Sequence, residues 1–195
     1  MGESIVYQAK DFSYLKGTAG FSDTLLENHF KLYQGYVKNT NIILEQLNLL
    51  KKEGKDRAVD FAELKRRFGW EFNGMRLHEL YFENIGANNP LDPKSELAKK
   101  IIEDFTSLEQ WKKDFVSTAL MRGIGWVLLY QDSQSKQLFN VWVNEHDVGH
   151  LVTAKVILVL DVFEHAYLID YQLERAKYVE NFLNVINWKI VQARF

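Results

Sequence analysis

The sequence predicts an α+β fold in two parts: a helical first half, then a half that combines helices with a three-stranded sheet. Apolar residues recur every three or four positions through most of residues 22–85, which is the period of an amphipathic helix. Short runs rich in β-branched and aromatic residues begin only after residue 122. Both prolines fall in residues 86–96, between the halves. We therefore expect an N-terminal domain over residues 1–90 and a C-terminal domain over residues 91–195.

Four helices are expected before the sheet. The apolar spacing predicts one helix over residues 22–50 and a second over residues 60–85. Beyond the prolines, residues 95–121 predict two further helices, the second opened by Thr106 or Ser107.

Three strands and a helical segment are expected to complete the chain. The predicted strands are residues 123–132, 136–145 and 154–161, apolar runs separated by polar turns. Residues 162–190 return to a helical pattern.

Composition excludes several function classes. The chain has no cysteine, which rules out disulfides, thiolate metal sites and thiol catalysis. The net charge is −2 and the basic residues are scattered, so a nucleic-acid surface is not expected. No apolar run approaches the ~20 residues of a bilayer span, and residues 1–12 lack the pattern of a secretory leader. We expect a cytoplasmic protein that binds neither nucleic acid nor membrane.

The most informative stretch is DVFEHAYLIDY, residues 161–171, directly after the apolar run KVILVL. Asp161 is expected where the strand ends, and His165 follows four residues later. This spacing places the two side chains near one another, a workable arrangement for two ligands of one metal. Taken alone, the stretch favours the plainer interpretation, in which Asp161 caps the helix and His165 is an ordinary buried histidine.

This stretch resembles the signature of the iron/manganese superoxide dismutase family, D-V-W-E-H-A-Y-Y-x-D-Y, and departs from it at Phe163 and Leu168. The similarity continues through residues 175–188, RAKYVENFLNVINW, and reaches back to GIGW, residues 123–126. The second tryptophan of the family's W-x-W is Leu128 here. The resemblance implies an N-terminal α-helical hairpin domain and a C-terminal α+β domain with a three-stranded antiparallel sheet. It also implies superoxide dismutase activity, the conversion of superoxide to dioxygen and hydrogen peroxide by a metal alternating between trivalent and divalent states.

The family binds one iron or manganese ion per chain through three histidines and one aspartate. The resemblance implies that Asp161 and His165 are two of these ligands and that His78, in HELYF, is the second-helix ligand. In the first helix an ungapped alignment places Asn28 at the ligand position, whereas deletion of one residue places His29 there. Asparagine is a poor partner for a trivalent redox metal, so we expect His29 to be the ligand in a helix that has lost one residue.

The resemblance also implies roles for residues around the metal. Tyr36 is expected at the substrate channel, and Lys31 and Arg175 are expected to steer the anion. His146 occupies the place of an outer-sphere glutamine and could donate a hydrogen bond to metal-bound solvent, the alternative being an ordinary loop histidine. His150 has no matched position and is expected on the surface.

Residues of the family's subunit interface are partly retained. Glu164 matches a glutamate that hydrogen-bonds a ligand histidine of the opposite subunit, which implies a homodimer or a homotetramer. A polar pair across that interface is replaced by Leu32 and Leu168. Exchanging both members of such a pair can be nearly neutral, so we expect an apolar contact there.

Two other function classes share parts of this pattern. A non-haem iron oxygenase also uses two histidines and a carboxylate, but four protein ligands argue against its open coordination face. A metal-binding protein with lost or altered chemistry on the dismutase scaffold is the second alternative, because a fold does not fix a function. The changes at Phe163, Leu128 and Leu168 alter the lining that the activity would use.

Overall fold

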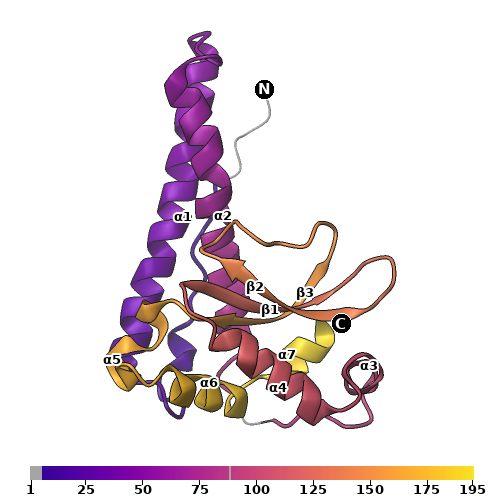
Figure 1. The fold of residues 1–195 in the computed structure, drawn as a ribbon. Coiled ribbons are helices and arrows are strands. Elements are labelled where there is room, and N and C mark those ends of the chain that lie inside the picture. The colour runs from indigo at the N-terminus through magenta and orange to yellow at the C-terminus, as the bar shows by residue number, and fades with distance from the viewer. Residues whose placement is uncertain (1–5, 88) are drawn as a thin grey trace.

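A computed structural model describes residues 6–87 and 89–195. Two parts of the predictions lie outside the described residues. They are residues 1–5, within the stretch expected to lack the pattern of a secretory leader, and residue 88 of the predicted linker. Two long helices, α1 (Asp23–Lys52) and α2 (Val59–Glu83), form a hairpin that projects from the rest of the molecule (Figure 1).

The sequence of α1 accounts for its start and for its buried face. Ser22 is the N-cap, and its hydroxyl accepts the N–H of Leu25 at 3.1 Å, which satisfies one of the free donors of the first turn. The buried residues recur every three or four positions, so one stripe of the helix faces the core. This stripe consists of Leu25, Leu26, His29, Tyr33, Val37, Thr40, Ile43 and Leu47.

The second half has the predicted mixture of helices and strands. Ser107, one of the two expected N-caps, caps the second helix, whereas Thr106 ends the first with φ of 68°. The strands form one antiparallel sheet in the order β2-β1-β3, in which the central strand is buried along its whole length. The elements are α3 (Glu96–Phe105), α4 (Leu108–Ala119), β1 (Gly125–Gln131), β2 (Leu138–Asn144) and β3 (Lys155–Asp161).

The closing segment differs from the helical pattern predicted over residues 162–190, because it is broken into short pieces. Gln172 has φ of 49°, which ends one helix. The turn before it is held by a tertiary contact, since Asp170 accepts both the N–H and the hydroxyl of Ser22, at 2.7 and 2.6 Å. The pieces are η2 (Glu164–Ala166), α5 (Leu168–Tyr171), α6 (Arg175–Asn184) and α7 (Trp188–Ala193).

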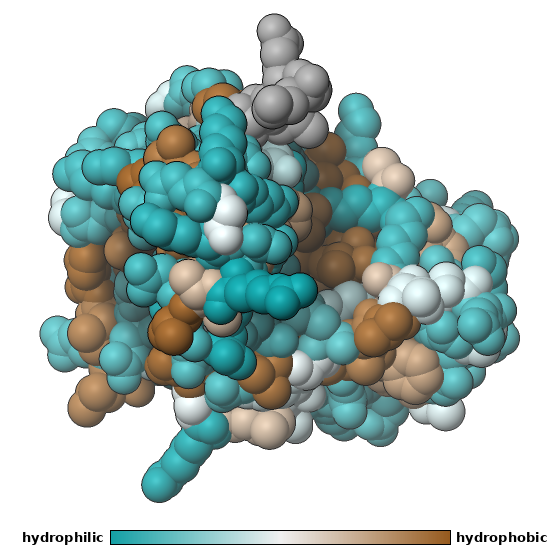
Figure 2. All heavy atoms as spheres, turned by 90° about the horizontal axis from the view of Figure 1, so that it is seen from above, coloured by the Kyte–Doolittle hydropathy of each residue, from teal (hydrophilic) through white to brown (hydrophobic). Residues whose placement is uncertain are grey.

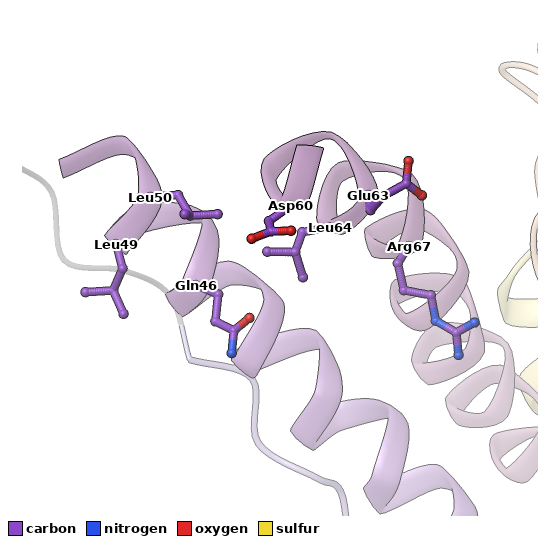
Figure 3. Close-up of a pocket in the computed structure, with 7 residues that line it drawn as sticks. All are labelled: Gln46, Leu49, Leu50, Asp60, Glu63, Leu64 and Arg67. Atoms are coloured by element: carbon purple, nitrogen blue, oxygen red, sulfur yellow. The ribbon is translucent and has the colours of Figure 1, made fainter. Parts of the chain in front are cut away.

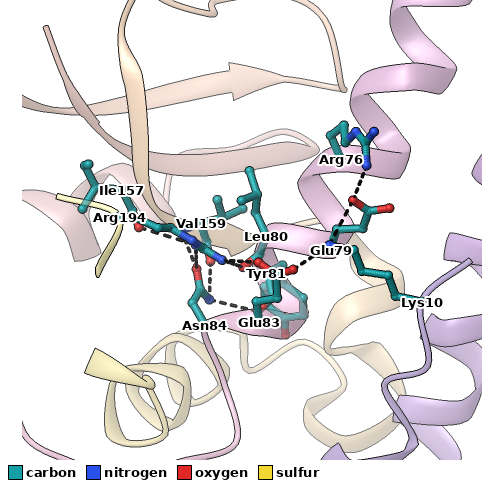
Figure 4. A network of polar contacts seen from close by, with 10 residues as sticks. All are labelled: Lys10, Arg76, Glu79, Leu80, Tyr81, Glu83, Asn84, Ile157, Val159 and Arg194. Carbon is teal, nitrogen blue, oxygen red and sulfur yellow. Dashed lines mark hydrogen bonds and ion pairs between the residues drawn. The ribbon is translucent and has the colours of Figure 1, made fainter. Parts of the chain in front are cut away.

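A polar joint fastens the end of α2 to β3 and to the C-terminal helix (Figure 4). The buried Asn84 pairs with Val159 as a neighbouring strand would, donating to its carbonyl at 3.1 Å and accepting its N–H at 2.9 Å. Arg194 donates at 2.9 Å to the carbonyl of Leu80 in the last turn of α2, and this carbonyl also accepts the N–H of Asn84. The joint fixes α2 against β3, two of the four elements that carry the site.

The surface seen along the hairpin is mostly hydrophilic (Figure 2). Hydrophobic atoms gather at its left margin, the side on which Figure 1 shows α5. Within residues 6–87 and 89–195, no helix combines the length and the apolar character that crossing a bilayer requires.

Candidate metal centre

Four side chains from four elements converge at the base of the hairpin. His29 comes from α1, His78 from α2, Asp161 from the last position of β3, and His165 from η2. Each offers one potential ligand atom, and these atoms all lie within 4.8 Å of one another. The first three residues have no exposed surface, and His165 is partly buried.

The distances in this cluster are those of donors around one ion. Oδ2 of Asp161 lies 3.1 Å from Nε2 of His29, 3.1 Å from Nε2 of His165 and 3.6 Å from Nε2 of His78. Donors that each lie about 2.1 Å from a common ion are separated by about 3 to 4 Å. The four atoms therefore surround a space that one metal ion fits.

His78 has a nitrogen that hydrogen bonding leaves free for a metal. Its Nδ1 lies 2.6 Å from the carbonyl oxygen of Gly74, which only accepts, so Nδ1 carries the ring proton. Nε2 therefore presents a lone pair to the cluster, and it has no hydrogen-bond partner among the described residues. A buried acceptor left in this way is costly unless a cation or a donor occupies the space in front of it.

Asp161 is oriented by two separate supports. Its Oδ1 accepts the N–H of Phe163 at 2.9 Å, which leaves Oδ2 directed at the histidines. Its main-chain carbonyl accepts the hydroxyl of Tyr178 at 2.7 Å, and Tyr81 donates in turn to Tyr178 at 3.0 Å. These contacts hold the end of β3 in place before any ion binds.

The protonation states suit metal binding. Burial lowers the pKa of His29 and holds the pKa of His78 well below the ordinary histidine value, so both rings are neutral near pH 7. Burial alone would raise the pKa of Asp161, but the imidazoles of His165 and His29, each 3.1 Å from its Oδ2, hold that pKa below the usual range. Neutral imidazoles and an ionised carboxylate are the forms that ligate a cation.

The geometry distinguishes between the two alignments of the first helix. Asn28 is exposed, whereas His29 points into the cluster from an α-helix that is continuous from Asp23 to Lys52. Nδ1 of His29 is buried without a hydrogen-bond partner in the described part of the chain. Packing orients this ring instead, since its centroid lies 4.9 Å from that of Phe82 and 5.0 Å from that of His78, edge to face in both cases.

His146 and Tyr36 lie beside the four-residue cluster and form a chain of hydrogen bonds with a fixed direction. The indole N–H of Trp126 donates to Nδ1 of His146 at 2.9 Å, so the proton of neutral His146 resides on Nε2. Nε2 lies 2.9 Å from the hydroxyl oxygen of Tyr36 and donates to it. The hydroxyl proton of Tyr36 is thereby left for another acceptor.

Both groups are neutral near pH 7. Burial lowers the pKa of His146 to about 4 and raises the pKa of Tyr36 above its ordinary value. The ring of Tyr36 stacks on His78, with centroids 5.1 Å apart. Tyr36, the last group in this chain of hydrogen bonds, therefore contacts His78 of the four-residue cluster.

Comparison with known proteins places this chain in a family. The family model described as iron/manganese superoxide dismutases, C-terminal domain, matches residues 93–194. The chain is 35% identical over 176 residues to an iron superoxide dismutase of Methanothermobacter thermautotrophicus, covering 89% of this chain and 85% of the relative. It is 38% identical over 168 residues to a manganese superoxide dismutase of Haloferax volcanii, covering 86% and 83%. An iron superoxide dismutase of Aquifex aeolicus is 32% identical over 193 residues, covering 96% and 90%. The chain belongs to the iron/manganese superoxide dismutase family.

The residues predicted to steer an anion occupy different surroundings in this family member. Arg175, at the start of α6, is partly buried, and its Nη1 donates to the carbonyl of Gly123 at 3.1 Å. Its Nε and Nη2 are buried and have no partner in residues 6–87 and 89–195. Lys31 is exposed on α1 two residues after His29, about 200° around the helix from it. Of the two, Arg175 has the unpaired donors that an anion requires.

The residues predicted for a subunit interface are at the surface of the dismutase chain. Leu32 is 41% exposed on α1 and Leu168 is 46% exposed at the start of α5. Glu164 is exposed next to His165.

Sequence reasoning missed several residues that support the site. Trp126 and Tyr178 lie in motifs that resemble the family, but their hydrogen bonds to His146 and to the Asp161 carbonyl follow only from the three-dimensional arrangement. His150 was expected on the surface, and this expectation is wrong. Its ring is partly buried and hydrogen-bonded to Tyr130 and to the main chain of His146.

A separate hollow lies near the tip of the hairpin and lacks this chemistry. A groove of about 580 Å³ opens between α1 and α2 near the tip of the hairpin (Figure 3). Its lining begins at residue 46, which lies about 25 Å along α1 from His29. It contains no histidine, and is lined by Gln46, Leu49, Leu50, Asp60, Glu63, Leu64 and Arg67.

Proposed function

We propose that the protein is a superoxide dismutase that converts two superoxide anions and two protons into dioxygen and hydrogen peroxide. The observation that carries the proposal is the convergence of three histidines and one aspartate on a buried point, in a member of a family whose relatives are named for this activity. The proposed ligands are His29, His78, Asp161 and His165.

The relatives include iron and manganese enzymes, so either ion is a candidate, at one per chain. When bound, such a metal supplies one-electron chemistry, accepting an electron from one superoxide and giving it to a second. The chain supplies neutral nitrogen donors and one carboxylate charge, which suits a redox ion that changes between trivalent and divalent states.

Proton delivery is assigned to the outer residues. Peroxide formation consumes protons, and Tyr36 keeps its hydroxyl proton free because His146 donates to the hydroxyl oxygen. The raised pKa of Tyr36 keeps that proton in place near pH 7. We assign Tyr36 the role of donor at the channel and His146 the role of holding it in that orientation.

Substrate attraction is assigned chiefly to Arg175. Superoxide is a small anion, and a half-buried guanidinium with two unpaired nitrogen donors attracts such a species more strongly than an exposed ammonium does. Lys31 would contribute through the longer-range field.

The proposed assembly is a homodimer, in which Leu32 and Leu168 lie in an apolar contact and Glu164 reaches the ligand histidine of the other subunit. The exposure of both leucines supports this proposal, as does the hydrophobic margin in Figure 2. Association of two dimers into a tetramer is the further possibility that the resemblance implies. We also propose a cytoplasmic location and a division into two domains near residue 90.

The function is tested by superoxide consumption in stopped-flow measurements after separate reconstitution with iron and with manganese. We expect catalysis by at least one of the two forms and its loss in His78→Ala. If metal-loaded protein were inactive in both forms, the alternative of a metal-binding protein with altered chemistry on this scaffold would replace the proposal. Retention of all four donors in one cluster disfavours that alternative.

A further inference from the structure

The loop that carries His146 is closed at its start by main-chain hydrogen bonds between Asn144 and Val148. It follows β2, and its first residue, Glu145, has φ of 49°. Residues 147–149 are exposed, so burial of apolar side chains does not hold them. Gly149 has φ of 106°, and a side chain there would lie 2.8 Å from the carbonyl oxygen of Trp142. The loop therefore folds closely over β2, and hydrogen bonds must keep it there.

His150 adds a side-chain contact at the far end of this loop. Its Nε2 lies 2.8 Å from the main-chain oxygen of His146, and its Nδ1 lies 2.7 Å from the hydroxyl of Tyr130, a buried residue of β1. The amide of Asn73, on α2, lies 3.4 Å from the same Nε2. The imidazole thus bridges the loop to the central strand beside α2.

The donors in this bridge are fixed by chemistry. A main-chain carbonyl only accepts, so Nε2 of His150 carries the ring proton and Nδ1 accepts from Tyr130. Tyr130 remains a donor because burial raises its pKa to about 12. One neutral tautomer of His150 satisfies both short contacts.

Both the imidazole ring and the main-chain carbonyl of His146 are therefore held by hydrogen bonds. Trp126 fixes the ring through Nδ1, and His150 fixes the carbonyl of the same residue. We propose that His150 is a positioning residue, which sets the place from which His146 donates to Tyr36. The proposal rests on the proposed function, because His146 matters only if its contact with Tyr36 does.

The test compares His150→Leu, which removes both hydrogen bonds at similar volume, with His150→Gln, whose amide keeps one donor and one acceptor. Val148→Ala is the matched control, an exposed residue of the same loop. The readout is the indole N–H signal of Trp126 in protein labelled with ¹⁵N-tryptophan and loaded with diamagnetic zinc. This readout does not depend on dismutase activity, so failure here is distinguishable from failure of the proposed function.

We expect His150→Leu to shift the Trp126 signal and to speed its exchange with solvent about fivefold, the factor that one net hydrogen bond is worth. His150→Gln and Val148→Ala should leave the signal in place. In the iron-loaded chain, His150→Leu should shift the midpoint potential at unchanged metal content, and His150→Gln should restore it.

An unchanged Trp126 signal in His150→Leu overturns the proposal. If His150→Leu displaces the signals of all five tryptophans, the variant has loosened the whole fold, and Tyr130→Phe becomes the deciding variant. That variant removes only the donor to Nδ1, and we expect it to shift Trp126 alone. An unchanged Trp126 signal in Tyr130→Phe would then contradict the assignment.

Discussion

Two glycines of α2 should respond in opposite ways to the same substitution. A Cβ at Gly74 would lie 2.6 Å from Cδ1 and 2.8 Å from Cε1 of Tyr36, whereas a Cβ at Gly69 meets nothing within 4 Å. Both residues lie in the same helix. Alanine at each position therefore separates the cost of crowding Tyr36 from the general effect of replacing a helical glycine.

The magnitudes follow from the contact. The ring of Tyr36 would have to retreat by roughly 0.8 Å to regain ordinary contact, which would stretch its 2.9 Å bond to His146 beyond hydrogen-bonding range. Overpacking costs about 1 to 3 kcal/mol, a lost net hydrogen bond costs about 1 kcal/mol, and alanine returns about 0.8 to 1 kcal/mol of helix propensity. We expect Gly74→Ala to lower the free energy of unfolding by about 1 to 3 kcal/mol and Gly69→Ala to raise it by about 1 kcal/mol.

Thermal unfolding at fixed metal content measures this difference, at about 2 to 4 °C per kcal/mol for a chain of this size. The activity of Gly74→Ala should also fall about 10- to 100-fold through loss of the outer hydrogen bond, while Gly69→Ala stays active. The reasoning would be refuted if both alanines stabilised the protein equally and both retained full activity.

Three further predictions concern the ligands, the joint and the pH dependence. His29→Ala should leave the purified protein with almost no bound iron or manganese, as measured by mass spectrometry. Asn28→Ala should leave the metal content unchanged. The reverse result would assign the ligand to Asn28. Asn84→Ala should lower the free energy of unfolding, measured in urea, by about 2 to 4 kcal/mol, because the N–H and carbonyl of Val159 lose their partner. A loss under about 0.5 kcal/mol would contradict the role of Asn84 in fastening α2 to β3. The metal-free chain should lose stability as pH falls from about 6.5 to about 4, because the unfolded chain takes up protons on His29, His78 and His146 at higher pH than the folded chain does. His146→Gln should reduce the slope of this dependence in urea titrations at several pH values, and a slope as steep as that of the unaltered chain would assign it to the other two histidines.

The fold was predictable where local pattern and tertiary environment agree. The spacing of apolar residues gave both hairpin helices, and Ser107 was among the two expected caps because a serine before a helical pattern satisfies a free N–H. The closing segment was mispredicted as one helical stretch because nothing local signals the break at Gln172. That turn depends on the contact between Asp170 and Ser22, which are 148 residues apart in the chain.

The candidate site was predictable to the extent that its residues lie in short motifs. Asp161 and His165 are four residues apart, and the end of a strand brings them together. The choice of His29 over Asn28 depended on ligand chemistry, and the burial of His29 agrees with it. His150 was missed because its contacts, a carbonyl in a loop and a tyrosine on β1, carry no sequence pattern.

The most direct test of the account is an anomalous diffraction map, recorded at the metal absorption edge on crystals of the metal-loaded protein that consumes superoxide. We predict one peak per chain, about 2.1 Å from Nε2 of His29, His78 and His165 and from Oδ2 of Asp161. A peak at any other place, or one from which His29 is absent as a ligand, would contradict the account.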